Sequence, residues 1–266
     1  MHRQRGDDQG MEAETVLDVQ ALVVRYGAQT AVDRLTFSVR RGEIFGLLGP
    51  NGAGKTSTLN VIEGLRAPDA GRVTVAGHDA AHAPAALKAS LGVQLQASSF
   101  QPELRIEDIA RLYAGLYGVR MGRRQIDERL RDAGLSQEAG KPFKKLSGGQ
   151  QQRFSLMVAT LHDPSILLLD EPTTGLDPQS RRQLWDRIED SRRAGGSVLL
   201  TTHSMEEAQA VCARVAIMDH GRLLALGAPA ALVEEHRGDP SVLAVAHGDV
   251  TLEDVFIGLT GRAIRD

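Results

Sequence analysis

The sequence has very little of three features that would place it in other protein classes: cysteine, long apolar runs and net charge. Its single cysteine, Cys212, excludes an intrachain disulfide and a multi-cysteine zinc site, and is typical of a reducing compartment. Cys212 lies in an apolar stretch, so we expect a buried small hydrophobic side chain and not a reactive thiol. Because no run of about 18 apolar residues is present, no segment is expected to span a bilayer. The formal net charge of −3 gives no reason to expect general nucleic-acid binding.

The remaining composition is that of an ordinary globular protein. The chain has 266 residues, of which 42% are hydrophobic and 24% charged, enough for one large or two small domains with a substantial core. The first ten residues, MHRQRGDDQG, lack the apolar centre of a signal peptide. We therefore expect a flexible N-terminal tail over residues 1–15 and a cytoplasmic protein whose membrane role, if any, comes through a partner.

Periodicity in the sequence predicts an α/β architecture. Alternating segments at 16–24 and 35–39 predict two strands joined by a turn near Tyr26, and 71–75 predicts another short strand. Runs that are apolar on both faces, at 165–169 and 197–200, indicate parallel strands covered by helices. A helix is expected between them over about 178–193, and a further strand at 211–218.

A different pattern occupies about residues 102–161. Helical periodicity there predicts a mostly helical insertion. The expected apolar stripe of its first helix comprises Ile106, Ile109, Ala110, Leu112, Tyr113 and Leu116.

The most informative segment is Gly49-Pro-Asn-Gly-Ala-Gly-Lys-Thr56, which fits the template G-x-x-x-x-G-K-[ST]. It follows the apolar run 44–48 and precedes a helix expected over about 55–65. Glycines let the main chain approach phosphates, and the first N–H groups of the helix favour anions. Lys55 is expected to reach the β- and γ-phosphates, and the Thr56 hydroxyl to ligate Mg²⁺. The residues expected to bind the nucleotide here are Gly49, Pro50, Asn51, Gly52, Ala53, Gly54, Lys55, Thr56 and Ser57.

Two carboxylates follow the apolar residues 166–169. At the carboxyl edge of a parallel sheet, where ligands of such folds bind, Asp170 is placed to hold Mg²⁺ directly or through water. Glu171 is then a candidate general base that polarises water for attack on the γ-phosphate. An acidic pair after a strand is weak evidence alone, so this interpretation depends on Lys55 and Thr56 upstream.

The segment Leu146-Ser-Gly-Gly-Gln150 predicts a second anion site. Ser147 is a good N-cap, and Gly148 and Gly149 expose the backbone at a helix start, with Gln150 following. The glycine-rich loop already occupies one side of the γ-phosphate. The simplest explanation is that this second site serves a nucleotide held by another chain, which predicts a head-to-tail pair with two symmetric interfaces.

With these motifs the chain resembles the ATP-binding subunit of an ABC transporter, from about residue 16 to residue 230. LSGGQ is that family's signature. The resemblance implies an α/β fold: a P-loop NTPase (RecA-like) core with a mainly parallel sheet, a small antiparallel β subdomain and a helical insertion. It implies an ABC ATPase domain over 16–235, with a helical subdomain inserted at about 97–162, and a short C-terminal extension over 236–266.

The same resemblance implies roles for further residues. Tyr26 sits where such proteins stack an aromatic ring on adenine. Gln96 resembles the glutamine that meets Mg²⁺ and the attacking water, with Gln94 as a competing candidate. Asp177, in Thr-Gly-Leu-Asp, resembles the loop that links the two nucleotide sites, and His203 matches the switch histidine that contacts the γ-phosphate. All catalytic elements are present, so we expect hydrolysis with ATP and Mg²⁺.

The expected partners are a second ATPase subunit, identical or related, and a separate membrane permease; no nucleic acid is expected. The protein would then be peripheral on the inner face of the membrane. Thr251, with an acid three residues on, predicts a short capped helix. This ending and residues 105–118 resemble exporter ATPases of the daunorubicin-resistance type, which implies export of a drug, antibiotic or lipid-like substrate. An importer ATPase is the main alternative, and a soluble ABC ATPase acting on ribosomes or DNA is another.

Overall fold

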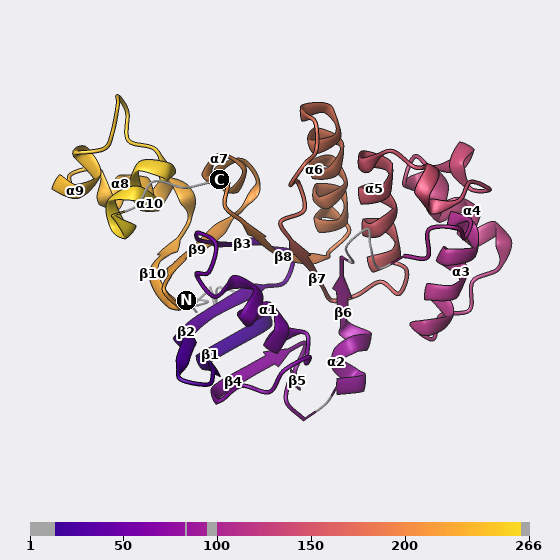
Figure 1. The fold of residues 1–266 in the computed structure, drawn as a ribbon, viewed down its shortest axis with the longest axis horizontal. Coiled ribbons are helices and arrows are strands. Elements are labelled where there is room, and N and C mark those ends of the chain that lie inside the picture. Colours follow the sequence, from indigo (N-terminus) through magenta and orange to yellow (C-terminus); the bar gives the residue numbers. More distant parts are fainter. Residues whose placement is uncertain (1–13, 83, 95–99, 262–266) are drawn as a thin grey trace, which may run out of the picture.

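A six-stranded sheet forms the centre of the computed structural model, which describes residues 14–82, 84–94 and 100–261 (Figure 1). The strand order is β10-β9-β3-β8-β7-β6, with parallel pairing throughout except for the antiparallel β9–β10 pair. The strands are β3 (Ile44–Leu48), β6 (Leu91–Val93), β7 (Ile166–Asp170), β8 (Ser197–Thr202), β9 (Arg214–Asp219) and β10 (Arg222–Gly227). This mainly parallel sheet was expected from the apolar runs.

A four-stranded antiparallel sheet, in the order β2-β1-β4-β5, packs on one side of the centre. Its strands are β1 (Thr15–Tyr26), β2 (Gln29–Arg40), β4 (Ala70–Val75) and β5 (His78–Asp79). β1 and β2 are longer than the predicted strands, because the hairpin pairs from Tyr26 with Gln29 out to Thr15 with Arg40. Residue 15 therefore belongs to the sheet and not to the expected tail.

Ten α-helices are described, and most lie where the sequence predicted helix. They are α1 (Lys55–Ile62), α2 (Pro84–Ser90), α3 (Ile106–Leu116), α4 (Arg123–Asp132), α5 (Gly148–Ala159), α6 (Pro178–Arg193), α7 (Met205–Val211), α8 (Pro229–His236), α9 (Pro240–Leu243) and α10 (Leu252–Thr260), with 3₁₀ turns at Ser136–Glu138 and Phe143–Lys145. α1 ends before the predicted residue 65, since Gly64 takes a φ of +68°.

One predicted strand was wrong at its start. Residues 211–213 precede β9, and Val211 is the last residue of α7. The hydroxyl of Ser204 caps this helix by accepting a hydrogen bond from the N–H of Glu207. The apolar residues that suggested a strand at 211 instead end a helix packed on the sheet.

Alternate residues of the central strands enter two different cores, because side chains point to opposite faces at successive positions. Phe45 and Leu47 face the antiparallel sheet and α1, whereas Ile44 and Leu48 face the cluster formed with α5, α6, α7 and the C-terminal helices. The second cluster includes Phe256 of α10. The capped C-terminal helix predicted from Thr251 is present, and the Thr251 side chain accepts from the N–H of Asp254.

The helical subdomain has a core of its own. Ile106, Ile109 and Ala110 of α3 are buried against α4 and α5, with Phe154 near the centre. The predicted stripe was wrong for Leu112 and Leu116, which are 52% and 69% exposed. Leu112 points away from the buried side of α3, and Leu116 is the last residue of the helix, whereas Ala114 continues the buried side.

Cys212 behaves as the sequence predicted. Its side chain is buried at the sheet, where a Cβ added to Gly46 would lie 2.9 Å from its Sγ. Burial raises the pKa of the thiol to about 12, so it stays protonated at neutral pH. Within the described ranges, no helix is both long and apolar enough to cross a membrane.

Candidate functional site

Three adjacent strands of the central sheet bring the predicted motifs to one edge. In the parallel register Leu48 of β3 pairs with Thr202 of β8, and Asp170 of β7 pairs with Thr201 of β8. The glycine-rich loop leaves β3, His203 follows β8, and the acidic pair ends β7. Since parallel strands end together, the strand order alone gathers segments more than a hundred residues apart.

The glycine-rich loop needs glycine for steric reasons. Gly54 is the N-cap of α1 with a φ of +105°, and an added Cβ would lie 2.5 Å from the carbonyl oxygen of Ala31. At Gly49 an added Cβ would lie 2.4 Å from the carbonyl oxygen of Met218. The loop is thus packed between β2 and the end of β9 and its turn. The first N–H groups of α1 have no partner within the helix and can donate hydrogen bonds to an anion.

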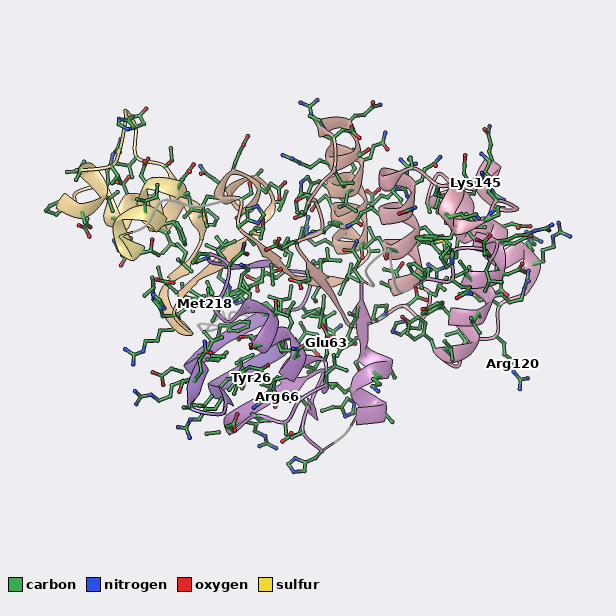
Figure 2. All side chains as sticks on the ribbon, in the orientation of Figure 1. Tyr26, Glu63, Arg66, Arg120, Lys145 and Met218 are labelled. Carbon is green, nitrogen blue, oxygen red and sulfur yellow. The ribbon has the colours of Figure 1, made fainter. Side chains whose placement is uncertain are left out.

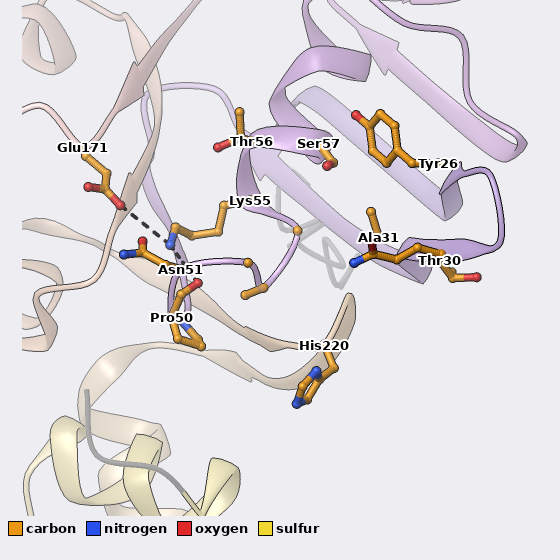
Figure 3. Close-up of a pocket in the computed structure, with 14 residues that line it drawn as sticks. Tyr26, Thr30, Ala31, Pro50, Asn51, Lys55, Thr56, Ser57, Glu171 and His220 are labelled. Atoms are coloured by element: carbon orange, nitrogen blue, oxygen red, sulfur yellow. Dashed lines mark hydrogen bonds and ion pairs between the residues drawn. The ribbon is translucent and has the colours of Figure 1, made fainter. Parts of the chain in front are cut away.

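Lys55 lies at the base of this loop, with its side chain almost completely buried. Its ammonium donates to the carbonyl oxygens of Gly49, at 2.6 Å, and Pro50, at 3.2 Å. It also lies 3.7 Å from Glu171 Oε1 (Figure 3). Burial lowers the pKa of Lys55 below its ordinary value, and the negative charges of Glu171 and Asp170 oppose that shift.

Glu171 lies in the middle of a row of three polar side chains, between Lys55 and His203. Its Oε2 lies 3.4 Å from His203 Nδ1, on the other side from Lys55. Glu171 adopts the left-handed region, with a φ of +46°, at a cost of about 1 kcal/mol. This conformation is held because its N–H donates to Thr201 Oγ1 at 3.0 Å, and that hydroxyl in turn donates to Asp170 at 2.5 Å. Backbone strain therefore aims the predicted base into the site.

A pocket of about 550 Å³ lies over the loop, with Glu171 and Tyr26 at opposite ends (Figure 3). It contains most of the predicted loop residues and four residues that the sequence interpretation missed. Its lining comprises Tyr26, Gln29, Thr30, Ala31, Pro50, Asn51, Gly52, Ala53, Gly54, Lys55, Thr56, Ser57, Glu171 and His220.

The missed residues come from the start of β2 and from one turn. Gln29, Thr30 and Ala31 follow the Tyr26 hairpin, and the predicted turn could have placed them near the ring. His220 lies in the β9–β10 turn, whose Gly221 donates to the carbonyl oxygen of Ala53 in the glycine-rich loop. No sequence signal connects this turn to the loop, because the contact depends on strand order.

The oxygen donors suit a hard divalent cation. Thr56, the second residue of α1, and Asp170, the last residue of β7, are both exposed, and their oxygens are the ligands that Mg²⁺ prefers. Among the described residues, no group of three or more His, Cys, Asp or Glu side chains could hold a metal ion. A cation here would therefore take most of its ligands from phosphates and water, as Mg²⁺ usually does.

The signature segment lies on another element and does not line this pocket. Ser147 caps α5: its hydroxyl accepts from the N–H of Gln150, whose side chain accepts from the N–H of Ser147. Gly149 packs on α6, since an added Cβ would lie 2.5 Å from Ser180 Oγ. Gly148 is exposed. One chain thus brings together the loop and the acidic pair but leaves the second predicted anion site facing elsewhere.

Asp177 is joined to the signature helix. It caps α6 by accepting from the N–H groups of Gln179 and Ser180, and it also accepts from Ser180 Oγ at 2.6 Å. The bond from Ser180 is the chief reason that the pKa of Asp177 lies below its ordinary value. Because Ser180 also touches Gly149, we expect the 174–177 loop and the signature to move together.

Gln96 lies outside the described residues, so its predicted role stays a prediction. The competing candidate, Gln94, follows β6 and donates its N–H to the carbonyl oxygen of Leu168. Both polar atoms of its side chain are buried without a hydrogen-bond partner among the described residues.

Glu207 is a buried carboxylate that the sequence analysis did not identify, and it links two segments of the site. Glu207 of α7 accepts from Thr173 Oγ1 at 2.7 Å and from Thr202 Oγ1 at 3.4 Å, and it pairs with Arg181 at 3.2 Å. Thr173 and Thr202 are near neighbours of Glu171 and His203. Glu207 thus links the two segments that carry Glu171 and His203.

A second missed carboxylate lies behind the site. Glu63 is the C-cap of α1, and burial, followed by the nearby charge of Asp170, raises its pKa to about 7. Burial depends on how α1 packs, which the local pattern does not contain.

We expect Glu63→Gln to stabilise the protein at high pH. A pKa near 7 in the folded state, against 4.5 ordinarily, means that the folded protein binds the proton more tightly. Glu63 therefore reduces stability as pH rises from 4.5 to 7, by about 2 kcal/mol after allowance for its exposed part. Urea unfolding in EDTA should show the variant more stable than wild type at pH 8 but equal to it at pH 4.5. A pH-independent difference, or the same gain from the exposed control Glu253→Gln, would contradict this.

The family model and the similar curated proteins both point to ABC transporters. Over residues 32–174 the sequence matches the family described as ABC transporter. Nod factor export ATP-binding protein I of Ralstonia nicotianae is 34% identical, covering 97% of this chain and 97% of the relative. The protein of the same description from Paraburkholderia xenovorans is 37% identical, covering 94% of this chain and 83% of the relative.

Solved structures are similar over most of the chain. An ATP-binding subunit of an ABC transporter aligns with a TM-score of 0.80 and 29% identity, covering 92% of this chain and all of that one. A nucleotide-free ATP-binding cassette from an ABC transporter aligns with a TM-score of 0.76 over 86% of this chain and 97% of the other; at 21% identity this likeness concerns the fold alone.

Proposed function

The chain belongs to the ATP-binding proteins of the ABC transporter family, as its motifs predicted, and from that premise we propose that it powers an exporter through a composite, two-chain ATP site. ATP binding and hydrolysis coupled to transport are the activities of this family. Export is the direction in the names of the relatives, which agrees with the exporter-type ending of the sequence. The cargo we propose is a drug-, antibiotic- or lipid-like molecule.

The observation that carries the proposal is the row Lys55–Glu171–His203 at the end of the pocket. The Glu171 carboxylate lies within 4 Å of both the Lys55 ammonium and the His203 imidazole, and the three residues follow three adjacent strands of the sheet. Lys55 is placed to neutralise terminal phosphates, and Glu171 to accept a proton from the attacking water. His203 holds Glu171 from the other side and can contact the same phosphate.

Tyr26, at the opposite end, supplies a platform for the base. The glycine-rich loop between the two ends offers N–H groups to the phosphates. Mg²⁺, held by Thr56 and Asp170, would neutralise phosphate charge. This chain's own residues orient the nucleotide and move the proton at Glu171.

The second anion site completes the proposal. Ser147 to Gln150 do not reach the pocket of their own chain, so we assign them to the nucleotide of a second subunit. Two chains arranged head to tail then close over two nucleotides. Loss of the terminal phosphate removes the charge that both chains bind, and the pair opens. Gly149 and Asp177, joined through Ser180, would carry this change toward the helical subdomain and a separate permease.

Export predicts a specific cellular effect of inactivating the site. Cells in which Glu171→Gln replaces the wild-type chain should become several-fold more sensitive to those amphipathic antibiotics that the transporter removes. Minimum inhibitory concentrations over a panel of such compounds measure this. Increased tolerance would instead indicate an importer. The exposed neighbour Glu206→Gln, in the first turn of α7, is the control and should leave sensitivity unchanged.

A further inference from the structure

The guanidinium of Arg66 lies over one face of the Tyr26 ring. The guanidinium carbon of Arg66 lies 4.3 Å from the centre of the Tyr26 ring, within the roughly 6 Å over which such pairs attract (Figure 2). Tyr26 lines the pocket, whereas Arg66 is not part of the described lining. The guanidinium therefore covers one face of the ring, and we assign the opposite face to the pocket.

Hydrogen bonds fix Arg66 to the residue that precedes the ring. Its Nη2 donates to the carbonyl oxygen of Arg25 and to Asp69 Oδ2, the latter at 3.0 Å. The same carboxylate oxygen accepts from the N–H of Arg25 at 2.7 Å. The hydrogen bond from the Arg25 N–H is the main reason that the pKa of Asp69 lies below its ordinary value, and the bond from Arg66 adds to the effect. Both polar groups of the Arg25 backbone are thus engaged by the Arg66–Asp69 pair.

The backbone of Arg66 is hydrogen-bonded to the C-terminal end of α1, the helix that follows the glycine-rich loop. The N–H groups of Leu65 and Arg66 donate to the carbonyl oxygen of Asn60 in α1, at 2.9 and 3.2 Å. α1 begins at Lys55 and ends at Ile62, so its first turn lies at the glycine-rich loop and Arg66 follows its C-terminal end. A single side chain therefore bridges the helix of the phosphate loop and the hairpin that carries the ring.

We propose that Arg66 is a positioning residue for the nucleotide base, which holds the Tyr26 ring at a fixed angle and distance from the phosphate loop by stacking on its far face. The inference rests on the proposed role of Tyr26 as the platform for the base. A base that stacks on the free face meets a ring already ordered, so less conformational freedom is lost on binding. The guanidinium also draws electron density from the ring, which favours stacking with an electron-rich purine.

The test separates binding of the base from binding of the phosphates. Affinities of wild type and Arg66→Met are measured for the β,γ-imido analogue of ATP and for inorganic tripolyphosphate, which has no base. We expect the variant to bind the ATP analogue about 3- to 10-fold more weakly and tripolyphosphate unchanged. Arg66→Lys, which keeps the cation but lacks the planar group, should recover part of the loss. Arg72→Met, on β4 of the same sheet, is the matched control and should bind both ligands like wild type.

A double-mutant cycle with Tyr26→Ala decides whether the effect passes through the ring. In the Tyr26→Ala background, Arg66→Met should cause no further loss. If Arg66→Met weakens binding of both ligands equally, or if the losses of affinity in the cycle are additive, Arg66 only stabilises the local structure and the proposal is overturned. If Arg66→Met fails to fold, Arg66→Lys serves in the cycle, and unchanged affinity for the ATP analogue would overturn it equally. Should Tyr26→Ala itself leave that affinity unchanged, the proposed role of Tyr26 fails instead.

Discussion

Replacing Glu171 with glutamine is expected to slow ATP turnover by about 100- to 10,000-fold while ATP binding persists. Glutamine preserves the shape of the side chain but cannot accept the proton of the attacking water. Because the change removes a negative charge 3.7 Å from Lys55, beside the expected γ-phosphate, affinity for ATP should hold or increase slightly. Steady-state phosphate release and equilibrium nucleotide binding measure the two effects.

The same variant should reveal the second subunit. With ATP bound and not hydrolysed, the charge that joins the two chains persists, and size exclusion in ATP should show a dimer that wild type forms only briefly. Glu206→Gln, an exposed change near His203, should behave like wild type. A Glu171→Gln protein that hydrolyses ATP at the wild-type rate would remove Glu171 from the role of general base.

The local sequence was sufficient to predict elements whose signal lies within a few residues. The helix Pro178–Arg193 has the predicted bounds, since Asp177 caps it and proline follows at its first position. The strands before the loop and before the acidic pair were predicted because both are apolar on two faces. The capping box at Thr251 likewise predicted α10.

Features that depend on packing between distant segments were missed. Leu112 and Leu116 have the spacing of a buried stripe, yet α3 presents Ala110 and Ala114 to its partners, because the positions of α4 and α5 decide which face is covered. α7 was missed because its seven residues give too short a periodic signal beside the apolar residues around Val211.

The site residues also divide into those with a local sequence signal and those placed by contacts between distant segments. Lys55, Glu171 and the loop between 49 and 57 could be predicted, because each needs a local template. His220 enters the pocket only through the contact between Gly221 and Ala53, and Glu207 only through its bonds to Thr173 and Thr202. Such residues follow from strand order, which no local pattern contains.

Lys55→Ala should weaken ATP binding about 10- to 100-fold, because it removes a buried cation aimed at the phosphates. The variant also loses the bonds from Lys55 to the carbonyl oxygens of Gly49 and Pro50, so the loop itself should become less ordered. Lys88→Ala, at an exposed position in α2, is the matched control and should bind like wild type. Near-normal ATP affinity in Lys55→Ala would contradict the phosphate role of this residue.

Mixing this variant with a signature variant tests the two-chain site directly. Ser147→Arg places a bulky cation at the cap of α5 and should abolish turnover while its own phosphate loop stays intact. Neither variant should hydrolyse ATP alone. In a mixed pair, the intact loop of the Ser147→Arg chain faces the intact signature of the Lys55→Ala chain, which restores one site in two. With random pairing, an equimolar mixture should regain about a quarter of wild-type activity. If the mixture stays inactive although the two chains associate, or if Ser147→Arg alone is fully active when strictly monomeric, the nucleotide does not lie between two subunits.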